Sequence, residues 1–490
     1  MRTMFAFRSL LLMLGLAATC PAIAVEPTLE LPPPLELNLA PGLCEAPATL
    51  SDLSLQTAVQ IALCKAPRVR QAHLSIEEEL ANLRTAHAKY LPTLDANADA
   101  NRIGKRVKYP DHTGANHSLH TNSGNARLGL SWLLFDSGRR DAQYDSAHAR
   151  LTAALYSQVL ANRDRAVAVA DSYYKACHAA VSAEAARQAV SRAKQSLQAT
   201  QRLREGGVGS LADEQLAKLA WQRNLVDNDT KATTAAISRA VLATTIGLPG
   251  QSAINLSKAP DSTFRANPTT ASRRAGHLSP SPVVGSNDIH SQLNERIITA
   301  VRNHPRLAAA RASTQAANAE AQAINAQHLP SVTLQADRHT GFTPPASSVA
   351  KQKVNGWSVG FTVHIPIFDG YATKHATDAA RVRAQSARET ERSIWLEEEL
   401  KLLTDVSQMT SANHKEALLK DAEASAQQAY RSAQVRYQEG VGTALELLKA
   451  LDELASIQQT AIDVHYELLA TRFRVSVALD TLPPVRIERH

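Results

Sequence analysis

The sequence predicts a mainly α-helical fold with a small β part, arranged as a tandem repeat of long helical hairpins. The 490 residues are 44% hydrophobic but only 4% aromatic, a composition typical of long, closely packed helices. The helical pattern breaks twice in the same way, at "LLFDSGRRD" (133–141) and at "PIFDGYATK" (366–374). Each break follows short alternating segments that read as β-strands.

The N-terminus is expected to be a signal peptide over residues 1–24. Arg2 and Arg8 make a basic start, "SLLLMLGLA" is a short apolar core, and "AIA" offers small residues for cleavage before Val25. A lipoprotein signal around Cys20 is the alternative, although Thr19 before it fits that signal poorly. We therefore expect an exported mature chain that begins with an extended, Pro-rich arm over 25–53.

The three cysteines that remain after cleavage are Cys44, Cys64 and Cys177. In an exported protein, Cys44 and Cys64 could form a disulfide that ties the arm to the first helix. The alternative is that both are small buried thiols. Cys177 lies within a helical repeat and is expected to serve packing.

The chain is an internal duplication. "CKAPRVRQAHLSIEEELANLRTAHAKYLPTLDANAD" (64–99) aligns with "RNHPRLAAARASTQAANAEAQAINAQHLPSVTLQAD" (302–337), and "FDSG" and "GVGS" reappear as "FDG" and "GVGT". Such landmarks in one order indicate duplication. The sequence predicts a first repeat over 54–248, a Pro- and Ser-rich linker over 249–290, a second repeat over 291–480 and a tail over 481–490.

Each repeat is expected to contain one long helix and two shorter ones. No proline interrupts Arg139 to Glu205, so one helix of about 67 residues would run roughly 100 Å. The other predicted helices follow the same scheme: 54–90, 211–247, 291–329, 371–439 and 443–479. Gly207, Gly209 and Gly440 mark the tight turns between the long helices and the helices that follow. Apolar residues at three- and four-residue spacing predict coiled-coil packing.

Four segments alternate apolar and polar residues and are predicted to be strands: 91–102, 125–135, 331–339 and 356–368. A period of two over about ten residues suits a strand that crosses a bilayer at a tilt. Trp132 and Trp357 fall at opposite ends of their strands, where interfacial aromatic residues would lie. The alternative is ordinary hairpins on a soluble core, but no compact domain remains to cover their apolar face. Because lipid does not tolerate open sheet edges, several chains must share one closed sheet.

These features resemble the TolC family of outer-membrane efflux and secretion channels. The resemblance rests on "SLQTAVQIALCKAPRVRQA" and its repeat "ITAVRNHPRLAAA", the "LP" strand entries, "FDSG"/"PIFDG" and "GVGS"/"GVGT". It covers nearly the whole mature chain, and "ALCKAP" with the Cys-bearing arm is more similar to the type I secretion (CyaE-like) branch. It implies a homotrimer in which four strands per chain form a shared transmembrane β-barrel, continuous with a periplasmic α-barrel.

The resemblance also implies a gate at the periplasmic turns. A gate tyrosine of the family matches Tyr437, and an aspartate that it contacts matches Asp213. The family's gate arginine falls on Gly442 here, so that charge-assisted link is in doubt. Of two constriction aspartates in the family, one matches Glu446 and the other is Lys449. A ring of Glu446 would favour cations, whereas Lys449 three residues later could pair with it; solvated helix ends would explain both residues equally.

No catalytic function is expected. The net charge of +7, or +5 without Arg2 and Arg8, is dispersed rather than gathered in a block with aromatics, so nucleic-acid binding is not indicated. No serine-hydrolase, zinc-protease or phosphate-loop motif lies in a fitting context, and neither cofactor nor metal is expected. The sequence predicts a passive outer-membrane duct, and the resemblance implies that this duct serves a periplasmic adaptor and an inner-membrane transporter. The runner-up is a soluble periplasmic coiled-coil adaptor.

Overall fold

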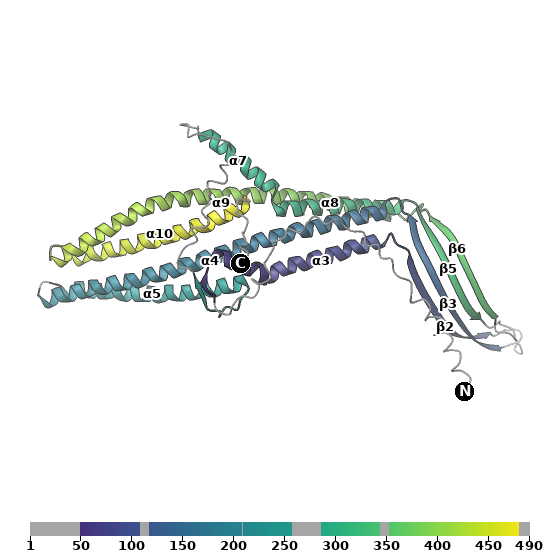
Figure 1. The fold of residues 1–490 in the computed structure, drawn as a ribbon, viewed down its shortest axis with the longest axis horizontal. Coiled ribbons are helices and arrows are strands. Elements are labelled where there is room, and N and C mark those ends of the chain that lie inside the picture. The colour runs from purple at the N-terminus through teal and green to yellow at the C-terminus, as the bar shows by residue number, and fades with distance from the viewer. Residues whose placement is uncertain (1–49, 108–116, 208, 257–285, 344–351, 480–490) are drawn as a thin grey trace, which may run out of the picture. The chain divides into compact units, whose positions relative to one another are not determined.

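A computed structural model describes residues 50–107, 117–207, 209–256, 286–343 and 352–479 (Figure 1). The predicted signal peptide and tail, and most of the predicted arm and linker, lie outside the described residues. The fold class predicted from the sequence is confirmed. The elements, in chain order, are β1 (Leu50–Leu53), α2 (Leu55–Lys65), α3 (Pro67–Ala88), β2 (Thr93–Val107), β3 (His117–Phe135), α4 (Arg139–Glu205), α5 (Leu211–Ile246), β4 (Ile254–Leu256), α7 (Ser286–Arg302), α8 (Pro305–Asn325), the 3-10 turn η4 (Ala326–His328), β5 (Ser331–Thr343), β6 (Gln352–His364), α9 (Ala372–Gln438) and α10 (Ala444–Ala478).

The two long helices α4 and α9 have 67 residues each. Helix α4 packs against α5, α3 and α8, and α9 packs against α8 and α10 (Figure 1). Much of the buried surface of α4 is alanine and serine, including Ala176, Ala183 and Ala193, and such small side chains let helix axes approach closely. The predicted ranges of the long helices agree with these bounds to within one residue.

Two predicted helices are each broken in two, which corrects the ranges 54–90 and 291–329. Helix α2 ends at Lys65 and α3 begins at Pro67, and α7 ends at Arg302 before α8 begins at Pro305. The residue before each proline is extended, with ψ of 125° at Ala66 and 131° at His304. Proline forces this conformation on its predecessor because its ring clashes with a helical one.

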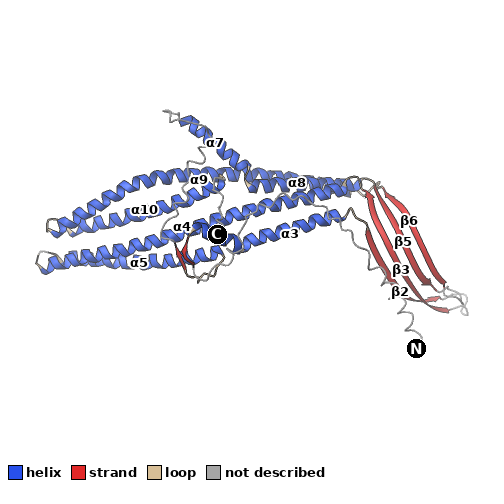
Figure 2. Cartoon of the chain, in the orientation of Figure 1, coloured by secondary structure: helices blue, strands red, loops and turns tan. Residues whose placement is uncertain are grey.

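The four strands of the repeats form one antiparallel sheet in the order β2-β3-β5-β6 (Figure 2). Leu94 lies opposite Leu130, Leu130 opposite Ala336, and Ala336 opposite Val359. The strands run further toward their loops than 91–102, 125–135 and 331–339 predict. In contrast, β6 ends at His364 rather than 368, where the chain approaches Pro366, which cannot donate a ladder hydrogen bond. Strands β2 and β6 are the edges of the sheet.

A second, two-stranded sheet pairs β1 with β4 in parallel. It was not predicted, because strands this short show no alternating pattern in the sequence. Leu53 and Ile254 from these strands are buried with residues of α2, α4, α5 and α10. The Tyr173 hydroxyl on α4 donates a hydrogen bond to the Leu53 carbonyl at 3.2 Å. This cluster holds the middle of α4 against the end of α10, which contributes Phe473 and Val477.

Candidate functional site

The two turns that join the helical hairpins are built alike. Gly207 and Gly440 have φ of +79° and +75°, a left-handed conformation that only glycine adopts without strain. The amide of Gly209 donates to the Leu203 carbonyl at 2.9 Å, and the amide of Gly442 donates to the Arg436 carbonyl at 3.0 Å. These bonds close the last turns of α4 and α9.

Gly442 has little room for a side chain. A Cβ atom added there would lie 3.0 Å from the backbone nitrogen of Tyr437, and one added at Gly209 would lie 2.7 Å from the backbone nitrogen of Arg204. An arginine at 442 would therefore require the turn to shift. The turn geometry gives a physical reason for glycine at the position where the resemblance would place a gate arginine.

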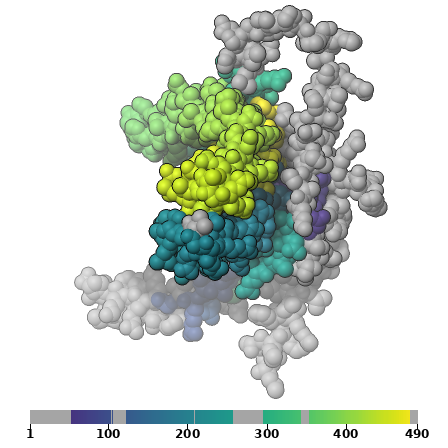
Figure 3. All heavy atoms as spheres, turned by 90° about the vertical axis from the view of Figure 1, so that its left-hand side faces the viewer, coloured from purple at the N-terminus to yellow at the C-terminus, as the bar shows by residue number. Residues whose placement is uncertain are grey.

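Tyr437 is buried near the end of α9, with 5% of its surface exposed. It packs in a cluster with Ala193 of α4 and with Tyr430, Leu447 and other residues of α9 and α10, to which Trp221 of α5 adds a partly buried ring. This cluster joins the ends of the two hairpins, which lie beside each other in Figure 3. Burial, and secondarily the charge of Asp213, raise the pKa of Tyr437. The hydroxyl is therefore neutral and able to donate a hydrogen bond.

Asp213 lies in the first turn of α5, after the cap Ser210. Its charge acts on Tyr437, but in the part of the chain that the structure describes no hydrogen bond joins these two side chains. The neighbouring Glu214 instead forms an ion pair with Arg204 at 2.7 Å across the turn between α4 and α5. The structure thus places Asp213 near enough for its charge to act on Tyr437, without a hydrogen bond between their described side chains.

Glu446 and Lys449 are both exposed on the first turns of α10. The Glu446 amide donates to the cap hydroxyl of Thr443 at 3.2 Å, so the carboxylate lies near the positive end of the helix. Among the described residues these two side chains form no ion pair with each other. The pairing that the sequence allowed is therefore not formed in this structure.

A polar cleft of about 230 Å³ lies between α4 and α9, next to Tyr437. Its walls carry mostly glutamine, serine and arginine side chains: Gln195, Ser196, Gln198, Arg202, Gln434 and Gln438. Tyr430 and Tyr437 also line it. The cleft therefore has hydrogen-bonding side chains at the hairpin ends, and its described lining includes no aspartate or glutamate.

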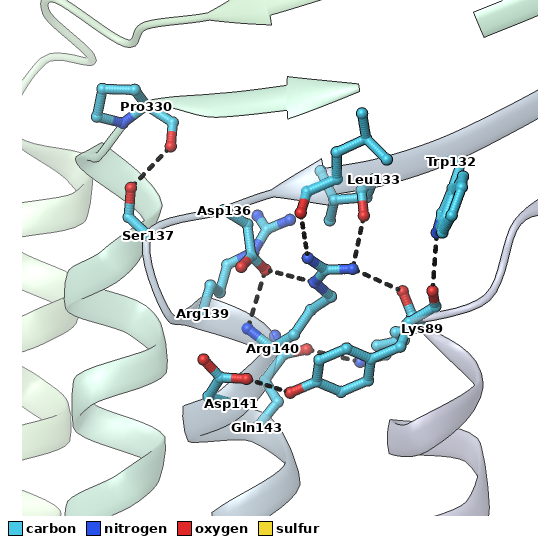
Figure 4. Close-up of polar contacts among 12 residues, drawn as sticks. Lys89, Trp132, Leu133, Asp136, Ser137, Arg139, Arg140, Asp141, Gln143 and Pro330 are labelled. Carbon is cyan, nitrogen blue, oxygen red and sulfur yellow. Dashed lines mark hydrogen bonds and ion pairs between the residues drawn. The ribbon is translucent and has the colours of Figure 1, made fainter. Parts of the chain in front are cut away.

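The first strand-to-helix junction contains a buried ion pair that the sequence did not reveal (Figure 4). Arg140 has 8% of its surface exposed and Asp136 has 5%. The Nε atom of Arg140 lies 3.3 Å from Asp136 Oδ2, which also accepts the Arg140 backbone amide at 2.9 Å. The guanidinium donates to the carbonyls of Leu133 at 2.6 Å, Leu134 at 3.1 Å and Lys89 at 3.5 Å.

Tyr90 completes this junction. The guanidinium carbon of Arg140 lies over the ring of Tyr90, 4.8 Å from the ring centroid. The hydroxyl of Tyr90 is hydrogen-bonded to Asp141. The carbonyl of Tyr90 accepts the indole N–H of Trp132 at 2.9 Å (Figure 4). Trp132 is thus fixed to the end of α3, with part of its ring exposed.

The second junction keeps the carboxylate cap but lacks the guanidinium. Asp369 Oδ2 accepts the backbone amide of Thr373 at 2.8 Å, as Asp136 accepts that of Arg140. Thr373 stands at the place of Arg140 in the repeat. The aromatic side chains at this junction are not covered: Phe368 and Tyr371 are exposed beside a cleft of about 420 Å³.

The main sheet has one apolar and one polar face. Because side chains alternate along a strand, the register places Leu94, Leu128, Leu130, Trp132, Leu334, Trp357, Val359 and Phe361 on one face. Trp357 is 79% exposed there. The opposite face carries Asp95, Asp99, Asp337 and Arg127, and Arg127 forms an ion pair with Asp337 at 2.7 Å.

Cys64, in α2, is disulfide-bonded, and Cys44, the partner that the sequence suggests, lies outside the described residues. Cys177 is free, and burial raises its pKa to about 11. At that pKa the thiol stays protonated and unreactive at neutral pH.

Within the described ranges, no helix is both long and apolar enough to span a membrane.

Comparison with known proteins agrees with this architecture. The sequence model of the outer membrane efflux protein family matches residues 58–247 and 297–480. The chain is similar to Protein CyaE of Bordetella pertussis, with 27% identity over 445 residues that cover 88% of this chain and 85% of that protein.

Solved channel structures share the fold. A structure of CusC has a TM-score of 0.73 at 19% identity, covering 88% of this chain and 92% of that one. The open state of the MtrE outer membrane channel of Neisseria gonorrhoeae has a TM-score of 0.68 at 21% identity, covering 87% and 88%. VceC of Vibrio cholerae has a TM-score of 0.65 at 18% identity, covering 87% and 95%.

Proposed function

Because the chain belongs to the outer membrane efflux protein family, we propose that it is the exit duct of a tripartite export system, passive and gated at its periplasmic end. The chain is an outer-membrane exit channel and not an enzyme. Protein export of the type I kind is proposed over small-molecule efflux, because "ALCKAP" and the Cys-bearing arm resemble that branch.

The open sheet carries this proposal. Four strands with an apolar face end at β2 on one side and β6 on the other, and in lipid both edges need partners because unpaired backbone groups cost several kcal/mol each. Neighbouring copies of the chain can supply them. Three copies would give about twelve strands, within the range of outer-membrane barrels. We therefore propose a homotrimer.

The gate is proposed at the hairpin ends. Tyr437, held in the cluster that joins the two hairpins, and the nearby Asp213 would keep these ends together in the closed state. Opening would then require the hairpins to separate, which exposes part of this apolar cluster. Glu446 and Lys449, both exposed on α10, would line the approach to the opening.

The partners follow from the absence of an energy source in the sequence. No nucleotide-binding motif lies in a fitting context, so an inner-membrane transporter would supply the energy of export. A periplasmic adaptor would connect that transporter to the hairpin ends. The soluble adaptor that the sequence left as an alternative is not proposed, because the family is one of outer-membrane proteins and no domain among the described residues covers the apolar face of the sheet.

The test is the mass of the mature protein purified from outer membranes in mild detergent, corrected for bound detergent. A particle of three chain masses supports the shared sheet. A monomer that salt alone extracts from the membrane fraction contradicts the proposal, because its strands would never have entered lipid.

A further inference from the structure

The apolar face of the main sheet carries a small set of positive charges. In the register given above, Arg102 of β2, Arg338 of β5 and Lys353 of β6 share this face with Trp357 and Phe342. All three cations are exposed. Among the described residues this face has no aspartate or glutamate, because Asp95, Asp99 and Asp337 lie on the other face.

These cations lie toward the end of the sheet that is remote from the helices. Measured from the helical end of each strand, Arg338, Arg102 and Lys353 are about 23, 30 and 36 Å along the strand at ~3.3 Å per residue. With the usual tilt of outer-membrane strands, these distances are roughly 18, 23 and 28 Å of depth, around the outer limit of an apolar band ~25 Å tall.

The residues next to these cations are of the kind found at the edge of the apolar layer of a membrane. Arg338 is directly opposite Trp357, and Lys353 is directly opposite Phe342. Aromatic side chains are enriched at membrane interfaces, and long basic side chains extend their charged ends out of the apolar layer. Across the part of the sheet that the structure describes, none of the three cations has an ion-pair partner in the chain.

We propose that Arg338, Lys353 and Arg102 bind the phosphate groups of the phosphorylated glycolipid, lipid A, in the outer leaflet of the outer membrane. The inference rests on the proposed function, which places the sheet across that membrane with the helices on the periplasmic side. Guanidinium groups bind phosphate with two parallel hydrogen bonds, and ammonium groups bind it as a point charge. The acyl chains of the same lipid would cover Phe342, Trp357 and Val359.

The choice of a lipid over free phosphate follows from the surroundings of the cations. Three charges spread over three strands on a largely apolar face do not form a closed pocket for a small ion. They suit a ligand that carries phosphate groups above several hydrocarbon chains. One lipid molecule would contact both the apolar face, through its acyl chains, and the three cations, through its phosphate groups.

The test measures lipid retention by the purified full-length mature protein, using native mass spectrometry. The probes are lipid A with both phosphates, the same lipid with its phosphates removed, and phosphatidylethanolamine. We expect the double variant Arg338→Gln/Lys353→Gln to retain phosphorylated lipid A roughly 30-fold less, about fivefold for each lost charge. Retention of dephosphorylated lipid should not change between the native chain and this variant.

Two further variants keep the result interpretable. Arg127→Gln removes the same kind of charge from the polar face and should leave lipid A retention unchanged. Arg338→Lys keeps the charge and should retain most of the binding. Equal retention of phosphorylated and dephosphorylated lipid, equal loss in Arg127→Gln, or displacement of lipid A by millimolar inorganic phosphate would each overturn the proposal.

The lipid site and the proposed function can fail independently, and different results would show which one has failed. Failure of the native chain to fractionate with outer membranes would contradict the duct itself. A chain that assembles there as a trimer but shows no preference for phosphorylated lipid A would overturn the lipid site alone.

Discussion

The guanidinium of Arg140 ties three segments together at the first strand-to-helix junction. It reaches backbone carbonyls at the end of α3 and at the end of β3, while its own backbone opens α4. The buried carboxylate of Asp136 balances its charge. A buried charge that loses its partner is costly, because its desolvation is no longer offset.

The first prediction concerns this ion pair. Arg140→Gln should lower stability by about 3–5 kcal/mol, because it leaves the buried Asp136 carboxylate with only the more distant and more exposed Arg139 as a cationic partner. The measurement is the apparent unfolding temperature of the detergent-solubilised protein. Arg139→Gln is the matched control, since the Arg139 side chain is 39% exposed and its Nε lies 4.0 Å from Asp136. An equal effect of the two substitutions would contradict the role assigned to Arg140.

Tyr437 and Asp213 give the second prediction. If they hold the closed state, the double variant Tyr437→Phe/Asp213→Ala should raise the conductance of the isolated channel in a planar bilayer. The physical reason is the loss of a neutral hydroxyl donor and of the carboxylate whose charge acts on it.

Tyr430→Phe is the control for this experiment. Tyr430 is buried in the same cluster on the same helix, and burial likewise raises its pKa, but its charged neighbour is Arg192 rather than Asp213. Conductance should stay at the native value in Tyr430→Phe. An unchanged conductance in the Tyr437/Asp213 variant would remove these residues from the gate.

The two hairpin turns repeat the same backbone hydrogen bonds, and each turn is followed by a hydroxyl cap. Ser210 and Thr443 each cap the helix that follows, through a hydroxyl that accepts a backbone amide. The glycine that precedes each cap, Gly209 or Gly442, has little room for a Cβ atom. Turn, cap and helix end therefore form one unit that occurs once in each repeat.

The third prediction compares neighbouring glycines in the first turn. Gly207→Ala should cost about 1–2 kcal/mol because residue 207 is left-handed. Gly206→Ala should cost much less, because φ there is −75° and the nearest atom to an added Cβ is 3.4 Å away. Apparent unfolding temperatures would check both. Similar losses at the two positions would show that the turn does not impose its backbone conformation.

The sequence allowed the long helices and their turns to be predicted because proline-free runs end at Gly-rich stretches. The breaks at Pro67 and Pro305 were missed although the signal was present, since proline disfavours helix in the preceding residue. The outer ends of the strands were missed because "HSLHTNSG" has no apolar alternation. The role of Arg140 was not predictable, because an arginine after Gly138 reads as an ordinary exposed helix start.

The two repeats of the molecule have matching long helices but differ at their strand-to-helix junctions. The first junction is closed by Arg140 and Tyr90, whereas the second leaves Phe368 and Tyr371 exposed. The edge strand β6 leads into this open junction. In the proposed trimer, the exposed residues there would be available to a neighbouring copy or to lipid.

The fourth prediction tests which face of the sheet meets lipid. Phe361→Lys should reduce the amount of trimer assembled in outer membranes, because a lysine within the apolar band costs up to about 2–4 kcal/mol, the cost falling toward the interfaces. Thr362→Lys, one residue further along β6 on the polar face, should assemble nearly normally. Trimer yield in the membrane fraction is the measurement, and equal yields would contradict the assignment of faces.

The equal length of α4 and α9 limits how this chain can change by insertion and deletion. Removing one residue from either helix would rotate everything beyond it by about 100° and shift it by ~1.5 Å. That rotation would turn the alanine-lined faces away from their partners and displace one hairpin end relative to the other. A viable change in length would have to be made in both long helices and in the shorter helices beside them. Single-residue insertions should be tolerated far better in the stretch that the sequence predicts to be a Pro- and Ser-rich linker, residues 249–290.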